Sequence, residues 1–225
     1  MNENVKERLK NVNRSQLIKI VRKFPYILSY VEDKSIWEYF IENNSKFALY
    51  IENIPQTIQT EIVKRDSNDI KYIRNPSKET QLMAVKADGM SIEFINNPDK
   101  EVQLAAVKRN EYSIQYIKNP YKEVQLATVK KNARAIQFID NTDEEVQLEA
   151  VKKDGTSIQY IKNPSEEVQL EAVYNYFYSI QYISNPKKNT KLLYEVISNK
   201  GFVDIDNLDE KYDGITEFLL SKFHI

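Results

Sequence analysis

A 22-residue repeat constrains the fold of this chain more than any other feature. Asn-Pro recurs at residues 75, 97, 119, 163 and 185, and Asn141-Thr142 fills the gap in that series. Near-complete copies begin at Asn75, Asn97, Asn119, Asn141 and Asn163, and a weaker copy begins at Asn53. Residues 15–33 and 35–53 keep only the rhythm and a closing Tyr-Val or Tyr-Ile. The chain therefore contains about eight units, and we number positions within each from its opening Asn.

Each copy has the features of two short helices. Proline at position 2 suits a first helical turn, and the neighbouring Asn, Ser or Asp can cap the helix. A Glu follows shortly after, where the helix dipole favours a negative charge. The segment EVQLEAVKK forms the first predicted helix. It ends at Asn or Asp, followed by glycine in Asp88-Gly89 and Asp154-Gly155, which suits a left-handed C-terminal conformation. SIQYI then predicts a second helix of about one and a half turns; a strand would lack partner strands.

The first predicted helix is too short to be stable alone in water, so its apolar residues need a neighbouring repeat to cover them. The sequence therefore predicts an all-α fold, an α-solenoid of about eight 22-residue two-helix repeats with divergent terminal caps. We expect divergent N-terminal repeats over residues 1–52, regular repeats over residues 53–184 and a C-terminal helical cap over residues 185–225.

The motif E-V-Q-L-x-A-V-K-x-[ND]-G, followed by I-Q-[YF]-I, resembles an uncharacterised helical repeat family of bacteria, large viruses and protists, a domain of unknown function. It is also similar in outline to HEAT repeats and leucine-rich variant repeats. The resemblance covers residues 53–184 well, the first 52 weakly and the tail hardly. It implies a right-handed helical stack used for binding, and it carries no catalytic residues.

The composition bears on the cellular compartment of the protein and on how it would dock with a partner. The chain has no cysteine, which excludes disulfides and thiolate chemistry and fits a reducing compartment. No stretch resembles a signal peptide or a membrane span, so we expect a cytoplasmic protein without membrane partners. Residues 1–140 hold 23 Lys/Arg against 18 Asp/Glu, whereas residues 141–225 hold 9 against 15. Such charge polarity favours oriented docking. The richness in Lys, Asn, Ile and Tyr suggests an AT-rich bacterial or phage genome.

Glutamine recurs at position 7, in the middle of the apolar arc of the first helix. One interpretation is a line of amides on a binding face. The other, which we favour, is a structural ladder of buried or half-buried amides that bond neighbouring backbone or amide groups. We expect Gln103, Gln125 and Gln147 to lie mostly out of solvent. The ladder comprises Gln59, Gln81, Gln103, Gln125, Gln147 and Gln169.

Aromatic and charged residues form further periodic lines. Aromatics at position 20 are expected in the core of the second helix, although stacking on single-stranded nucleic acid is the alternative. They are Tyr72, Phe94, Tyr116, Phe138, Tyr160 and Tyr182. A basic ridge, which could hold a duplex backbone, comprises Lys64, Lys86, Lys108, Lys130 and Lys152 with Arg65, Arg109, Lys131 and Lys153 beside it. An acidic line on the same face is expected to neutralise this ridge: Glu79, Glu101, Glu123, Glu145 and Glu167.

The last regular copy replaces KKDGT (152–156) with YNYFY (174–178). Copies vary most at positions 9, 13, 15 and 16, where a partner would be recognised. The aromatic cluster is either a binding hot spot or a cover for the tail residues Phe202, Tyr212, Phe218 and Phe223. The candidate partner-binding residues are Tyr174, Tyr176, Phe177, Tyr178, Tyr112, Arg134, Arg109, Lys131 and Lys153.

The chain shows no catalytic, metal or cofactor motif. Its one histidine, His224, is penultimate, and it has no Gly-rich phosphate loop, H-E-x-x-H or nucleophile elbow. We therefore expect no enzyme activity, no cofactor and no metal. The predicted function is a protein–protein interaction scaffold or adaptor, or an inhibitor that binds a protein complex, such as phages use against host defence. The alternative is a HEAT-like solenoid that binds nucleic acid through the basic ridge.

Overall fold

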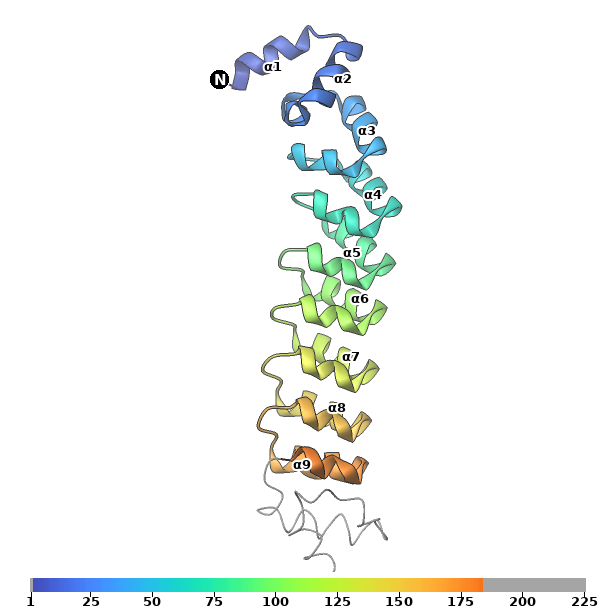
Figure 1. Cartoon of the computed structure of the whole chain (residues 1–225), viewed down its shortest axis with the longest axis vertical. Coiled ribbons are helices and arrows are strands. Elements are labelled where there is room, and N and C mark those ends of the chain that lie inside the picture. The colour runs from blue at the N-terminus through green and yellow to red at the C-terminus, as the bar shows by residue number, and fades with distance from the viewer. Residues whose placement is uncertain (1, 184–225) are drawn as a thin grey trace, which may run out of the picture. The chain divides into compact units, whose positions relative to one another are not determined.

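The computed structural model describes residues 2–183, and all regular structure in this range is helical (Figure 1). From α2 onward an α-helix and a 3-10 helix, labelled η, alternate through the described residues, which confirms the predicted all-α repeat fold. The α-helices are α1 Asn2–Lys10, α2 Arg14–Lys23, α3 Lys34–Asn43, α4 Gln56–Arg65, α5 Lys78–Ala87, α6 Lys100–Arg109, α7 Lys122–Lys131, α8 Glu144–Lys153 and α9 Glu166–Asn175. The 3-10 helices are η1 Pro25–Tyr30, η2 Ser45–Tyr50, η3 Ser67–Tyr72, η4 Gly89–Phe94, η5 Glu111–Tyr116, η6 Ala133–Phe138, η7 Gly155–Tyr160 and η8 Phe177–Tyr182.

The second helix of each repeat is thus wound more tightly than an α-helix. At the end of η4 the Ile95 N–H donates to the Ile92 carbonyl three residues earlier, at 3.0 Å. Three residues per turn place positions i and i+3 on the same side of the helix. Ile92 and Ile95 are both buried, so the 3-10 winding points both isoleucines into the core.

From α3 onward, a single extended residue joins each α-helix to its 3-10 helix. Asp88 has φ −139° and ψ 115°, and its N–H still completes the last turn of α5 by donating to the Ala84 carbonyl at 2.9 Å. Its carboxylate accepts a hydrogen bond from the Met90 N–H at 2.9 Å and so caps η4. One residue therefore closes one helix and opens the next.

The glycines after this corner do not adopt the expected left-handed conformation, and that prediction is wrong. Gly89 and Gly155 begin η4 and η7, and glycine is favoured there because of a close approach. A Cβ on Gly89 would lie 2.6 Å from the Ala106 carbonyl of α6, and one on Gly155 would lie closer still to the Ala172 carbonyl of α9. The absence of a side chain lets the next helix pack against the backbone.

The left-handed residues lie instead at position 1 of the repeat. Asn97, Asn141 and Asn163 have φ of 48°, 54° and 52°, a region that asparagine tolerates better than most residues. The α-helix begins three residues later, so proline is not in its first turn. Of the proposed caps, the residue at position 3 is used: Asp99, for example, accepts a hydrogen bond from the Val102 N–H at 3.0 Å.

The chain divides into two compact units, one ending at Ile117 and the other beginning at Lys118. In the first unit α4 packs beside α5 and α5 beside α6, while in the second α7 packs beside α8 and α8 beside α9 (Figure 1). Within each unit, successive 3-10 helices also pack against each other. The predicted boundaries after residues 52 and 184 stay predictions, and the predicted C-terminal cap lies outside the described residues.

Each regular copy buries the same five positions in the core, and nearly all of them are apolar. In the copy that begins at Asn97 they are Val102, Ala106, Val107, Ile114 and Ile117, all of them buried. The leucine at position 8 of the regular copies is only half-buried, as in Leu104 and Leu170. Small alanine at position 10 allows the α-helices of neighbouring repeats to approach closely.

Candidate functional site: the exposed face of the 3-10 helices

The recurrent glutamines fasten the turn that leads into each α-helix. Every amide nitrogen donates to the backbone carbonyl five residues earlier, at 2.9–3.0 Å. Gln59 and Gln103 are buried, and Gln81, Gln125, Gln147 and Gln169 are half-buried. The carbonyls are those of Ile54, Pro76, Pro98, Pro120, Thr142 and Pro164. The amide nitrogens are therefore engaged with the chain itself.

Gln59 also links one repeat to the next. Its amide oxygen accepts a hydrogen bond from the Ser77 N–H at 2.9 Å and another from the Thr80 hydroxyl at 3.1 Å. Ser77 caps α5, so the amide of one repeat holds the start of the following α-helix. This amide satisfies buried backbone groups, as buried polar side chains do in stable folds.

Some basic residues beside the ridge cap the preceding α-helix. Arg109, a candidate partner-binding residue, donates from Nε to the Ala87 carbonyl at the end of α5, at 3.1 Å. Arg65 donates in the same way to the carbonyls of Ile41 and Glu42 at the end of α3. A cation near helix C-terminal carbonyls is favourable because of the helix dipole. These two guanidinium groups are occupied within the fold.

The ridge lysines and the acidic line are not paired as expected. Lys64 binds Glu61 at 2.8 Å and Lys130 lies 3.7 Å from Glu149, so position 9 supplies the carboxylates. Glu61 lies one helical turn before Lys64 in α4 and so reaches it easily, whereas Glu149 reaches Lys130 from α8 of the next repeat. The prediction that the acidic line neutralises the ridge is therefore wrong for these lysines.

Two members of the acidic line instead bind a lysine at the start of the preceding α-helix. Glu101 and Asp99 both bind Lys78, at 2.7 and 2.9 Å, and the hydrogen bond that Lys78 donates to Glu101 is the main reason that the pKa of Lys78 is raised. Lys122 forms the same pair of contacts with Asp143 and Glu145 in the second unit. These exposed ion pairs tie repeat to repeat, and each contributes little to stability.

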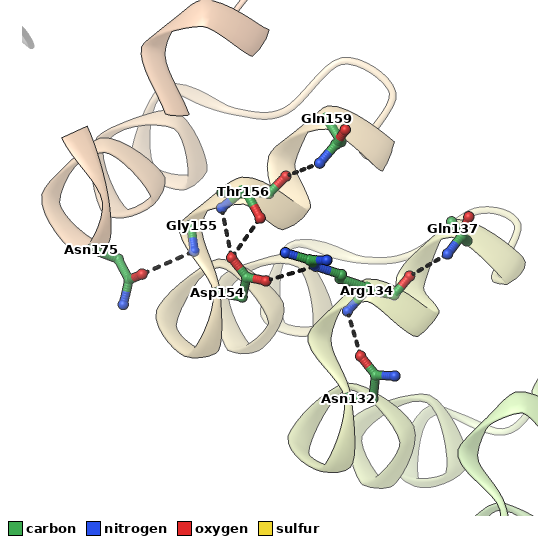
Figure 2. Close-up of polar contacts among 8 residues, drawn as sticks. All are labelled: Asn132, Arg134, Gln137, Asp154, Gly155, Thr156, Gln159 and Asn175. Carbon is green, nitrogen blue, oxygen red and sulfur yellow. Dashed lines mark hydrogen bonds and ion pairs between the residues drawn. The ribbon is translucent and has the colours of Figure 1, made fainter. Parts of the chain in front are cut away.

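Arg134 and Asp154 join two neighbouring 3-10 helices of the second unit (Figure 2). The Arg134 Nε lies 3.1 Å from the Asp154 carboxylate, which also accepts hydrogen bonds from the N–H and the hydroxyl of Thr156. Partial burial acts to raise the pKa of Asp154, but the Thr156 hydroxyl and Arg134 outweigh it, so the pKa lies below its ordinary value. The Arg134 guanidinium remains largely exposed.

The aromatics at position 20 are not core residues, and that prediction is wrong. Tyr116, Phe138, Tyr160 and Tyr182 are 36–39% exposed, and Tyr72 and Phe94 are half-buried. Position 20 lies between the buried isoleucines at 18 and 21, so the 3-10 winding turns it away from the core. We call Phe138, Tyr160 and Tyr182 the aromatic row of the second unit.

Glutamines at position 19 lie beside this row. Gln137 and Gln159 are exposed and donate to the carbonyls of Arg134 and Thr156, at 3.1 and 2.9 Å, which folds each amide back on its own 3-10 helix (Figure 2). Uncharged amides therefore flank the exposed rings.

The YNYFY segment changes both the corner and the surface of the last described repeat. Tyr176 takes the corner position and forms no side-chain cap, unlike the Asn or Asp of the other regular copies. Asn175 holds the neighbouring corner instead: it accepts from the Gly155 N–H at 2.9 Å (Figure 2). It also donates to the Lys152 carbonyl at 2.8 Å. Tyr174 and Tyr176 are 53% and 46% exposed.

The remaining candidates are distributed over both units. The Tyr176 and Tyr178 rings lie with centroids 5.6 Å apart, and Tyr178 is half-buried. Tyr112, Lys131 and Lys153 are exposed. The side chain of Phe177 and the proposed tail contacts Phe202, Tyr212, Phe218 and Phe223 lie outside the described residues.

Within residues 2–183 no cluster of acidic or histidine side chains could hold a metal ion, and no helix has the length and apolarity needed to cross a membrane.

Residues 121–164 match a family described as "Domain of unknown function (DUF4116)". The matched segment has the length of two repeats and includes α7, η6, α8 and η7. This part of the chain is thus similar to an uncharacterised domain, and here that domain is helical. The chain matches no curated protein and no solved structure.

Proposed function

We propose that this protein is a non-catalytic protein-binding module that uses the exposed face of its 3-10 helices. The aromatic row of the second unit carries the proposal, since it presents one partly exposed ring per repeat at a fixed position. Aromatic side chains bring a large contact area with little loss of rotamer entropy, and they are enriched in binding hot spots. The protein would act as an adaptor or as an inhibitor of a protein complex in the cytoplasm.

The surroundings of the row favour a protein over a nucleic acid. Its flanking amides are uncharged, and the nearby Arg134 is paired with Asp154. Of the basic residues that could hold a phosphate backbone, Arg65 and Arg109 bind helix carbonyls while Lys64 and Lys130 contact carboxylates. A surface for nucleic acid needs cations available to phosphates.

The test compares a variant of the aromatic row with a matched variant of the α-helical face. In the first, Phe138, Tyr160 and Tyr182 are each changed to serine. In the second, three exposed lysines, Lys86, Lys130 and Lys152, are changed to serine. Both variants and the unchanged protein are used for affinity capture from an extract of the native host, with quantitative mass spectrometry.

We expect the row variant to capture at least tenfold less of the specific partner than the unchanged protein does. Hot-spot truncations cost roughly 2 kcal/mol or more of binding free energy in total. The lysine variant should keep it, and circular dichroism should show that all three proteins are folded. Equal capture by the row variant would overturn the proposal. Binding of labelled random-sequence duplex or single strands at 0.15 M salt, with a steep salt dependence, would favour the nucleic-acid function instead.

A further inference from the structure

A lysine side chain in the first unit lies between the aromatic rings of two successive repeats. The Lys71 Nζ is 5.1 Å from the ring centroid of Tyr72, in its own 3-10 helix, and 5.3 Å from that of Phe94, in the next. Both distances are within the roughly 6 Å at which a cation is attracted to an aromatic face. Position-20 rings of neighbouring repeats can therefore hold one cation between them.

Tyr160 and Tyr182 occupy the same repeat positions in the second unit. Their 3-10 helices, η7 and η8, pack against each other as η3 and η4 do around Lys71. The residue that corresponds to Lys71 is Gln159, which has no charge and whose amide bonds the Thr156 carbonyl at 2.9 Å. This repeat therefore provides two partly exposed rings without providing the cation.

The charge around these rings suits a cation from outside. Residues 141–183 contain three lysines and eight carboxylates, and four of these carboxylates, Asp143, Glu145, Glu149 and Asp154, pair with Lys122, Lys130 and Arg134. An acidic surface draws cationic groups toward it and disfavours anionic ones. The other four carboxylates, Glu144, Glu166, Glu167 and Glu171, outnumber the three lysines by one, so the remaining charge of this segment favours a cationic occupant over an anionic one.

We propose that Tyr160 and Tyr182 form a notch that receives a lysine or arginine side chain of the partner protein. This inference rests on the proposed function and specifies the chemistry of the partner, a basic segment. Lys71 occupies the equivalent position in the first unit from within the chain, so the notch around Tyr72 and Phe94 is already filled.

The probe is the peptide acetyl-Gly-Ser-Lys-Ser-Gly-amide, with a norleucine peptide of otherwise identical sequence as its uncharged counterpart. The full-length protein carries 3-fluorotyrosine, and the ¹⁹F signals of Tyr160 and Tyr182 are assigned by single substitutions. We expect the lysine peptide to shift both signals and to bind about two- to fivefold tighter than the norleucine peptide, the range for an exposed cation–π contact.

Two substitutions test whether the notch itself is responsible. Gln159→Lys should fill it from within, as Lys71 does, and remove the shifts. Glu166→Gln, on the exposed surface of α9, changes the net charge by the same amount and should leave them within twofold. Lys71→Gln should open the equivalent notch and make the Tyr72 signal respond to the lysine peptide.

The proposal is overturned if the norleucine peptide binds as well as the lysine peptide, if neither signal shifts, or if Gln159→Lys binds like the unchanged protein. Its failure differs from failure of the proposed function. If the serine variant of the aromatic row loses the captured partner while Gln159→Lys retains it, the row binds protein without this notch. If capture is unaffected in both variants, the proposed function itself is wrong.

Discussion

Replacing Gln103 with methionine removes the amide that fastens the turn leading into α6 and leaves the length of the side chain nearly unchanged. Gln103 is 4% exposed, and its amide donates to the Pro98 carbonyl at 3.0 Å. Methionine has a similar length but no donor, so the carbonyl of the half-buried Pro98 loses this partner. Leaving a buried acceptor unsatisfied costs about 1–3 kcal/mol.

For a domain of this size, each kcal/mol lowers Tm by roughly 2–4 °C, so Gln103→Met should lower Tm by about 2–12 °C. Thermal unfolding followed by circular dichroism measures this loss. The matched control is Gln115→Met in η5, because the Gln115 amide donates to the Tyr112 carbonyl at the same 3.0 Å but lies on an exposed side chain. It should change the unfolding free energy by less than about 0.5 kcal/mol. Equal losses in the two variants, or no loss in Gln103→Met, would refute this account of the glutamine ladder.

Three further predictions concern stability, and thermal unfolding measures each. Ser157→Ala should raise the unfolding free energy by about 1 kcal/mol, since the hydroxyl is buried without a hydrogen-bond partner; a destabilised variant would contradict this. Gly155→Ala should lower it by about 1–3 kcal/mol, because the new Cβ meets the Ala172 carbonyl; an unchanged Tm would show that the helices separate freely. The pKa of Asp99 is lowered by the Val102 N–H and then Lys78, and that of Asp143 by Lys122 and then the Val146 N–H. The stabilisation by these two carboxylates is therefore complete above the unfolded-state pKa of about 3.9 and is lost as pH falls through the lower folded-state values. The Tm of Asp143→Asn should therefore fall less on acidification below pH 4 than the Tm of the unchanged protein. An equal fall would show that the Asp143 carboxylate does not stabilise the fold.

The repeat predicts much of the fold because its period and its helix-ending residues indicate where each helix begins and ends. A copy such as residues 97–118 contains one helix-length amphipathic segment, a polar corner and a short apolar segment. Such a unit can bury its apolar face only against its neighbours, which leaves stacked helical pairs as the outcome. The cap at Asp99 could also be anticipated, since Asn, Ser and Asp are the side chains that accept from the first helical N–H groups.

The details that sequence could not provide depend on winding and on contacts between repeats. Five or six residues fit an α-helix or a 3-10 helix equally well, and this choice decides whether Tyr160 enters the core between Ile158 and Ile161 or turns outward. Gly155 has the pattern of a left-handed cap, yet the carbonyl of α9 that excludes a Cβ lies one repeat away.

The candidate site was only partly accessible from the sequence. Variation between copies indicates Arg134 and Tyr174, which are exposed, and also Arg109, which caps α5. The aromatic row was missed as a surface because aromatics flanked by isoleucine usually signal burial. Position 19 holds Lys71 in one copy and glutamine, such as Gln159, in the later copies, and this difference was the available signal that neighbouring rings can hold a cation.

Photo-crosslinking tests most directly whether the 3-10 face binds a protein. Benzoylphenylalanine is introduced in place of Tyr160 in the aromatic row, or in place of Lys152 on the exposed surface of α8. After irradiation in the native host, the proposal predicts a discrete adduct from position 160 that protease removes and nuclease does not, with none from position 152. Adducts from position 152 alone, or adducts from position 160 that nuclease removes, would contradict it.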